Sequence, residues 1–167
     1  MIGGRSLRRE DPEREALDVV NQVLGGGLSS RLFEEIRERR GLVYSVYSSI
    51  SAFADAGAYL VYAGSQPKHA DVVIDLVRQE LHTLVESGIS DEELDVARGY
   101  LTGSFQLGLE DTGSRMARNG GQLCTTGAIR SVDDQVARWS AVDHDAVRSV
   151  IDRVFVPEPI MVTLGPT

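Results

Sequence analysis

Two chemically useful side chains flank one glycine, because Arg37 precedes Gly41 by four residues and Tyr44 follows it by three. Arg37 lies about one turn before the end of a predicted helix, and Tyr44 lies in the strand that follows. With a rise of roughly 1.5 Å per helical residue and roughly 3.3 Å per strand residue, a sharp reversal at Gly41 returns both side chains to one level. A cation and a phenol would then face the same cavity. Spacing alone favours simpler roles: a helix-surface charge, paired with Glu34 or Glu38, and a cross-strand packing residue.

The signatures of other catalytic chemistries do not occur in the sequence. A zinc hydrolase needs imidazole or carboxylate ligands at fixed spacing and a carboxylate base, yet His69, His82 and His144 form neither HEXXH nor HXXEH. We therefore expect no metal site in this chain, and solvated helix positions for His82 and Glu86. GGGLSS lacks the Gly-Lys-Ser/Thr ending of a phosphate loop. Cys124 has no flanking base and is expected to be a buried structural thiol.

The stretch that positions Arg37 and Tyr44 begins with three glycines, Gly25, Gly26 and Gly27. Ser29 or Ser30 then predicts the start of a short amphipathic helix. The apolar face of this helix is expected to hold Leu32, Phe33 and Ile36. Gly41 occupies a C-cap position, and residues 43–52 have the composition of a strand.

Hairpin and helix signals around this stretch predict an α+β fold. Asp11-Pro12 is typical of a helix start, and residues 58–64 are expected to pair with residues 43–52 across the FADAG turn. Pro67 opens a long helix that ends at Gly88. Its apolar stripe is predicted to hold Val72, Val73, Leu76, Val77, Leu81, Leu84 and Val85.

The last third of the chain is predicted to be mostly helical. Ser90 and Glu93 form a capping box, residues 111–123 are a further helix, and Ser131 and Asp143 are expected to cap two more. Residues 160–164 form a final strand. We predict one domain over residues 1–167, with a mainly antiparallel sheet and helices layered on one face.

Composition excludes several classes of partner. The chain has 42% hydrophobic and 25% charged residues, as soluble globular proteins do. Its formal charge of −8 and isoelectric point near 4.9 argue against a nucleic acid or a membrane as partner. One cysteine, no signal peptide and no apolar stretch of membrane-spanning length favour a cytoplasmic protein.

The stretch LGGGLSSRLFEEIRERRGLVYSVYS resembles the second half-domain of insulinase/pitrilysin-type zinc metallopeptidases, the family of the mitochondrial processing peptidase. The glycine run, SSRLF, the Arg–Tyr spacing and GLVYSV occur together in order, and the likeness continues to the terminal VTLGP. The resemblance implies a C-terminal half-domain that binds no metal itself. The Zn of the parent enzyme would be bound by the missing, HXXEH-bearing N-terminal half-domain.

The resemblance also implies roles for the site residues. In this family an Arg and a Tyr seven residues apart reach into the active site, and the matching residues are Arg37 and Tyr44. Both would be catalytic and substrate-binding hydrogen-bond donors, to the oxyanion of the scissile carbonyl or to a nearby substrate carbonyl. Gly25, Gly26 and Gly27 would add to the substrate-binding wall. The implied function is one half of a zinc endopeptidase that cleaves peptides or unfolded polypeptides.

Two other functions remain open. The first is a non-catalytic structural or adaptor subunit with the same fold, as in the core subunits of a respiratory complex, and the second is an unrelated α+β binding domain. Residues 1–5 have the composition of the end of a strand that began upstream. We therefore expect a first strand truncated at Met1, whose exposed sheet edge would favour a homodimer.

Overall fold

The computed structural model describes residues 1–165. Strands and helices are mixed along the first half of the chain, and the second half is mostly helical. In chain order the elements are β1 (Ile2–Ser6), α1 (Arg14–Gly25), η1 (Phe33–Glu38), β2 (Val43–Ala52), β3 (Gly57–Ser65), η2 (Pro67–His69), α2 (Ala70–Ser87), α3 (Asp91–Gly108), α4 (Thr112–Thr126), α5 (Val132–Ser140), α6 (His144–Val154) and β4 (Ile160–Met161). None of these helices is both long and apolar enough to cross a membrane.

The strands form one sheet in the order β2-β3-β1-β4, and each pair of neighbours is antiparallel. The strand β1 is therefore interior, and the expectation of an exposed sheet edge at the first strand is wrong. The cause is a long-range pairing, because β4 returns to place Met161 opposite Ile2 and Ile160 opposite Gly3. The sheet edges are β2 and β4.

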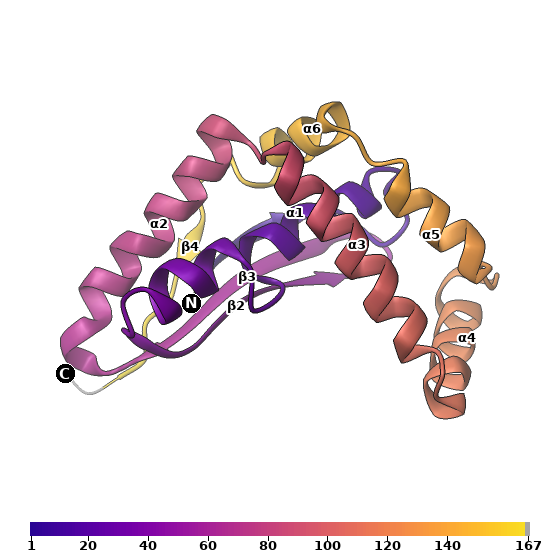
Figure 1. Ribbon diagram of the computed structural model, residues 1–167, viewed down its shortest axis with the longest axis horizontal. Coiled ribbons are helices and arrows are strands. Elements are labelled where there is room, and N and C mark those ends of the chain that lie inside the picture. Colours follow the sequence, from indigo (N-terminus) through magenta and orange to yellow (C-terminus); the bar gives the residue numbers. More distant parts are fainter. Residues whose placement is uncertain (166–167) are drawn as a thin grey trace.

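Helices cover one face of this sheet, as predicted for an α+β fold. The helices α1, α2 and α6 contact β2, β3 and β1 respectively, and Figure 1 shows α1 lying across the strands with α2 and α6 beside it. Inward side chains such as Val46 and Val61 are buried against these helices. On the opposite face, Tyr47 and Tyr62 stack with their ring centroids 5.2 Å apart. Helices α3 and α5 pack on α1 rather than on the sheet.

The innermost helix is α1, and its apolar stripe is buried as predicted. Leu17 and Val20 have no exposed surface, and Leu24 has almost none. Burying each such side chain stabilises the fold by roughly 1.5–3 kcal/mol relative to exposing it. The Oγ of Ser48 in β2 also donates to the carbonyl of Asn21, 3.1 Å away, so polar and apolar contacts both tie α1 to the sheet.

Most predicted helix caps are confirmed. Ser90 accepts from the amide of Glu93 while the Glu93 carboxylate accepts from the amide of Ser90, which is a complete capping box. The predicted caps Ser131 and Asp143 each accept from the amide three residues later and so begin α5 and α6. Asp111, which was not predicted as a cap, does the same at the start of α4.

Two predicted caps are wrong because other partners take the polar groups. The helix α1 begins at Arg14, and the carboxylate of Asp11 instead accepts from the amide of Glu13 and from Arg153. The helical segment does begin at Arg31, directly after Ser30, but the Ser30 side chain makes no cap, since its Oγ donates backwards to the Gly27 carbonyl at 2.6 Å.

Three further expectations need correction. Val72 lies on the outer side of α2 and is exposed, although the rest of the predicted stripe faces inward. Cys124 is exposed, because no residue of α4 is buried by the described part of the chain. The last strand spans Ile160–Met161, followed by two backbone hydrogen bonds between Val162 and Met1, and does not extend to Leu164.

Candidate functional site

The reversal between Arg37 and Tyr44 forms at Gly41, as predicted. Gly41 has a φ of +62°, a left-handed conformation that glycine adopts without steric cost. Its amide donates to the carbonyl of Arg37 at 3.0 Å, and the next amide, of Leu42, donates to the carbonyl of Ile36 at 3.1 Å. The strand β2 begins at Val43, directly after this turn.

The element before the turn is a π-helix rather than the predicted α-helix. In η1 the amide of Arg39 donates to the carbonyl of Glu34, five residues earlier, at 2.9 Å. The predicted apolar face is nevertheless buried, through Leu32, Phe33 and Ile36. Short π-helical turns are rare in proteins but frequent at functional sites. The conformation of the element that carries Arg37 is therefore consistent with a functional site.

Arg37 has no carboxylate partner within residues 1–165. Its guanidinium carbon lies 4.9 Å from the ring centroid of Phe33, an attractive cation–π distance. The expected pairing with Glu34 or Glu38 is not formed, because Glu34 pairs with Arg39 at 2.6 Å. The neighbouring acid is also neutralised, since Arg40 donates to Glu35 and lowers the pKa of that carboxyl. The positive charge of Arg37 is therefore left available at the surface.

Tyr44 is the extra residue of a β-bulge in the edge strand β2. Val43 lies opposite Ser65 and Ser45 lies opposite Gly64, so Tyr44 has no partner residue in β3. Its side chain is 88% exposed, which is unusual for a large aromatic residue. Bulges redirect side chains and are common beside active sites. Tyr44 thus projects from the sheet instead of taking the cross-strand packing role that spacing alone favoured.

The glycine run does not have one uniform role. A Cβ on Gly25 would lie 2.5 Å from the amide nitrogen of Ser48 and 2.8 Å from its Oγ, so α1 could not lie this close to β2 with a larger residue. Gly25 is buried, whereas Gly26 and Gly27 are half-buried beside Gln22. Packing against β2 explains why residue 25 is a glycine. A substrate-binding role for Gly25, Gly26 and Gly27 stays a prediction.

Arg37 and Tyr44 do not line either of two cavities found in this chain. One, of about 220 Å³, lies beside the glycine run between α1 and α3, with Gln22 and Ser29 in its wall. The other, of about 320 Å³, lies between α2 and the sheet, with Tyr59 in its wall. An active-site cavity that includes both donors would therefore need walls from another body.

The histidines do not assemble a metal site. Within residues 1–165 no three His, Cys, Asp or Glu side chains are grouped so that they could hold an ion. His82 and Glu86 are exposed on α2, as predicted, and the Nε2 of His144 lies 2.7 Å from an oxygen of Asp91. A zinc ion therefore has no fitting set of ligands among the described residues.

A residue that positions the site, Arg31, gave no signal in the sequence. Its Nε and Nη2 donate to the two carboxylate oxygens of Glu93 at 2.6 and 2.7 Å, and Nη2 also donates to the carbonyl of Gly88 at 2.8 Å. Burial raises the pKa of Glu93, but the bonds from Arg31 and Ser90 outweigh that effect and lower it. This clamp fixes the segment that leads into η1 onto the start of α3.

Comparison with a known family identifies the chain. The sequence model of the family described as the Peptidase M16 inactive domain matches residues 1–101. This chain belongs to the peptidase M16 family. Its resemblance to insulinase/pitrilysin-type peptidases is thereby confirmed for the inactive, C-terminal domain.

Individual relatives extend the match beyond residue 101. An uncharacterized zinc protease of Streptomyces coelicolor is 46% identical over 99% of this M16 domain, which covers 36% of that protein. An uncharacterized zinc protease of Bacillus subtilis is 34% identical over 90% of the domain, which covers 37% of it. The chain thus spans little more than a third of the length of the relatives that it matches.

Solved structures share the fold. A protease from Helicobacter pylori has a TM-score of 0.82 at 21% identity, with 92% of this M16 domain and 37% of that chain covered. A peptidase M16 inactive domain from Pseudomonas fluorescens has a TM-score of 0.81 at 23% identity, with 92% and 36% covered. These likenesses confirm the predicted α+β fold.

Proposed function

We propose that this chain is the C-terminal half of a zinc-dependent endopeptidase and supplies Arg37 and Tyr44 to a site completed by a zinc-bearing half. One observation carries the proposal. The two donors flank the turn at Gly41, both are exposed, and neither side chain has a hydrogen bond or ion pair within residues 1–165. Membership of the M16 family, and relatives named zinc proteases, support the choice of chemistry.

The two side chains suit the stabilisation of negative charge on a carbonyl oxygen. Zinc, when bound by the other half, supplies Lewis-acid activation for peptide hydrolysis. Tyr44 donates its phenolic hydrogen to the scissile carbonyl oxygen as charge develops there, or to a nearby substrate carbonyl. Arg37 donates to a substrate carbonyl or to the same oxygen. Both donors stand on hydrogen-bonded elements, so little reorganisation is needed when the charge forms.

We propose substrate contact for the glycine run as well. The half-buried Gly26 and Gly27 form part of the wall that faces the peptide, while Gly25 holds α1 against β2. Substrates of this half-enzyme are extended peptides or unfolded segments. Closure of the two halves excludes water from the site and completes it, so the isolated chain is inert.

The test is the peptidase activity of this chain joined to, or mixed with, a zinc-bearing half. Arg37→Ala and Tyr44→Phe are each expected to lower kcat/KM for an unfolded polypeptide by about 10²-fold, because each removes one transition-state donor. Arg40→Ala and Tyr47→Phe are the matched controls, an exposed arginine paired with Glu35 and a tyrosine stacked on Tyr62. Both controls should stay within a few-fold of the unsubstituted enzyme.

Two outcomes would contradict the assignment. Full activity in both Arg37→Ala and Tyr44→Phe would remove these residues from the site. No activity in any combination of halves would favour the adaptor subunit, which keeps the fold and lacks the chemistry. Association of the halves is measured in parallel by sedimentation, so that lost assembly is not mistaken for lost catalysis.

A further inference from the structure

We propose that the cavity between α2 and the sheet binds a small zwitterion with an apolar body, the class that includes free apolar amino acids and dipeptides. The cavity has a volume of about 320 Å³, within the range of about 300–1,000 Å³ that is usual for small-molecule sites. Neither Arg37 nor Tyr44 is in its wall, so the inference does not rest on the proposed function.

The interior wall of the cavity is largely apolar. Leu81 and Val85 contribute from α2, and Phe155 contributes from the end of α6. Ile2 of β1 and Met161 of β4, which lie opposite each other in the sheet, form the other side. A wall of this kind favours the transfer of an aromatic or branched side chain out of water.

Tyr59 adds a polar group without a partner to this wall. Its side chain is 4% exposed, and its hydroxyl is buried with no hydrogen-bond partner among residues 1–165. Buried polar side-chain atoms nearly always have a hydrogen-bond partner, so an exception needs an explanation. Burial raises the pKa of Tyr59, so the hydroxyl stays protonated at neutral pH and can donate. A bound molecule with a carbonyl or carboxylate oxygen would supply the missing acceptor.

The sheet holds the Tyr59 ring in place. Gly4 of β1 lies opposite Tyr59, and a Cβ on Gly4 would lie only 2.9 Å from the Tyr59 Cε1. The ring therefore occupies the space that a side chain at position 4 would need. On its other contact the ring packs against Phe155, with centroids 4.8 Å apart. The hydroxyl is thus fixed before a ligand binds, which lowers the entropic cost of binding.

Two side chains of opposite charge line the cavity without an ion-pair partner. Arg78 of α2 and Glu158, which lies between α6 and β4, are both exposed, and within residues 1–165 neither forms a salt bridge. They do not pair with each other either. A ligand with a carboxylate and an ammonium group can pair with both through charge-assisted hydrogen bonds. An anion alone would be repelled by Glu158 and a cation alone by Arg78, so the charges favour a zwitterion.

Binding to the 167-residue chain is measured by isothermal titration calorimetry with four probes. Phenylalanine and the dipeptide leucylphenylalanine carry both charges, N-acetylphenylalanine lacks the ammonium group, and phenethylamine lacks the carboxylate. We expect a Kd of about 1 mM or tighter for at least one zwitterion. Both single-charge analogues should bind about tenfold more weakly than that zwitterion, because each loses a charge-assisted contact. Shifts of the Leu81 and Val85 methyl resonances locate the bound molecule.

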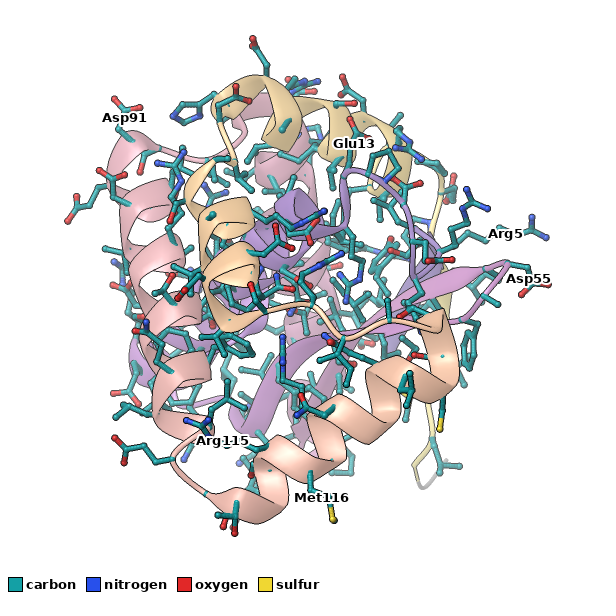
Figure 2. All side chains as sticks on the ribbon, turned by 90° about the vertical axis from the view of Figure 1, so that its right-hand side faces the viewer. Arg5, Glu13, Asp55, Asp91, Arg115 and Met116 are labelled. Atoms are coloured by element: carbon teal, nitrogen blue, oxygen red, sulfur yellow. The ribbon has the colours of Figure 1, made fainter. Side chains whose placement is uncertain are left out.

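Substitution of the two charges gives a second readout. Arg78→Gln and Glu158→Gln are each expected to weaken binding of the zwitterion by about tenfold, since each removes one charged partner. Arg5→Gln is the matched control, because Arg5 is exposed and is not in the cavity wall. Figure 2 shows Arg5 projecting away from the body of the molecule. All three positions are exposed, so circular dichroism should show an unchanged fold.

Tyr59→Phe tests the buried donor, because it keeps the ring and removes only the hydroxyl. Binding of the dipeptide should weaken by about two- to tenfold, since its peptide carbonyl loses a hydrogen bond. The unliganded variant should be no less stable to urea, because the hydroxyl has no partner in the described chain. Tyr62→Phe is the control, since Tyr62 stacks on Tyr47 on the opposite face of the sheet.

The same measurements decide between the two sources of the zwitterion. Tighter binding of leucylphenylalanine than of phenylalanine, with the difference lost in Tyr59→Phe, identifies a dipeptide site. Equal affinities that Tyr59→Phe leaves unchanged identify an amino-acid site.

Three results would overturn the inference. They are the absence of saturable binding for both zwitterions, equal binding of the single-charge analogues, and affinities that neither Arg78→Gln nor Glu158→Gln changes. None of them bears on the catalytic proposal, which is tested by the rates of Arg37→Ala and Tyr44→Phe.

Discussion

At the scale of single residues, Arg37 and Tyr44 differ from their neighbours because their side chains make few contacts within the described chain. Arg39 and Arg40 are bonded to Glu34 and Glu35, whereas Arg37 contacts only the ring of Phe33 among charged and aromatic partners in the described chain. Tyr44 has no partner residue opposite it in β3. Residues with so few internal contacts contribute little to stability, so substituting them should change binding or rate rather than folding.

Gly25 is the opposite case, because its small size is a requirement of the fold. We predict that Gly25→Ala lowers the free energy of unfolding by about 1–3 kcal/mol, since the new methyl group would overlap the backbone of Ser48. Gly99→Ala is the control, because a Cβ there meets nothing within 4 Å. That substitution should stabilise α3 by roughly 0.5–1 kcal/mol. Urea unfolding of both variants measures the difference, and equal effects would refute the packing role of Gly25.

At the scale of elements, the segment carrying Arg37 is held by contacts at both of its ends. The turn at Gly41 fixes the start of β2, and the Arg31–Glu93 pair fixes the segment before η1 to α3. The side chains of Arg31 and Glu93 are 18% and 29% exposed, so water screens this pair only in part. The element that presents Arg37 is therefore rigid at both ends.

We predict that Glu93→Ala destabilises the chain by about 2–3 kcal/mol, because it leaves the half-buried guanidinium of Arg31 without its carboxylate. Glu92→Ala, at the exposed position beside it in the first turn of α3, should change stability by less than about 0.5 kcal/mol. A double-mutant cycle with Arg31→Ala separates the pair from the capping box. A coupling free energy of zero would show that the clamp contributes nothing.

At the scale of the whole molecule, ion pairs connect the segment before α1 with the end of α6. Arg153, at the end of α6, donates to Asp11 at 2.8 Å and also to Glu13, both in the segment before α1. The bond from Arg153 holds the pKa of Asp11 below its usual range, against the opposing effect of burial. The same two acids raise the pKa of Arg153.

This pair predicts a dependence of stability on acid. A carboxyl whose folded pKa is lowered stabilises the fold above its unfolded pKa of 3.8, and the contribution is lost as pH falls below that value through the folded pKa. Asp11→Asn should therefore lower the free energy of unfolding by about 1 kcal/mol at pH 6. The difference from the unsubstituted chain should shrink towards pH 2. Urea unfolding at pH 6, 4 and 2 measures this, and a deficit independent of pH would contradict an electrostatic cause.

Local chemistry determined much of this protein from its sequence. The capping box at Ser90, the end of α2 at Gly88 and the reversal at Gly41 each depend on a few neighbouring residues, and each formed where the sequence predicted. The motif around Arg37 and Tyr44 likewise identified the family, because glycine, charge and strand signals occur there in a fixed order. Such signals depend only on residues that are close in the sequence, so they can be recognised without knowing where distant segments lie.

Contacts between distant residues were decided only by the tertiary structure. The bulge at Tyr44 depends on the register between β2 and β3, and the interior place of β1 depends on pairing with β4 at the other end of the chain. The Arg31–Glu93 clamp joins residues 62 positions apart. The exposed position of Cys124 on α4 follows from where polar partners for Arg115 and Arg118 lie. Sequence periodicity shows that a helix has an apolar side, but only packing decides whether that side is buried in the core of its own chain.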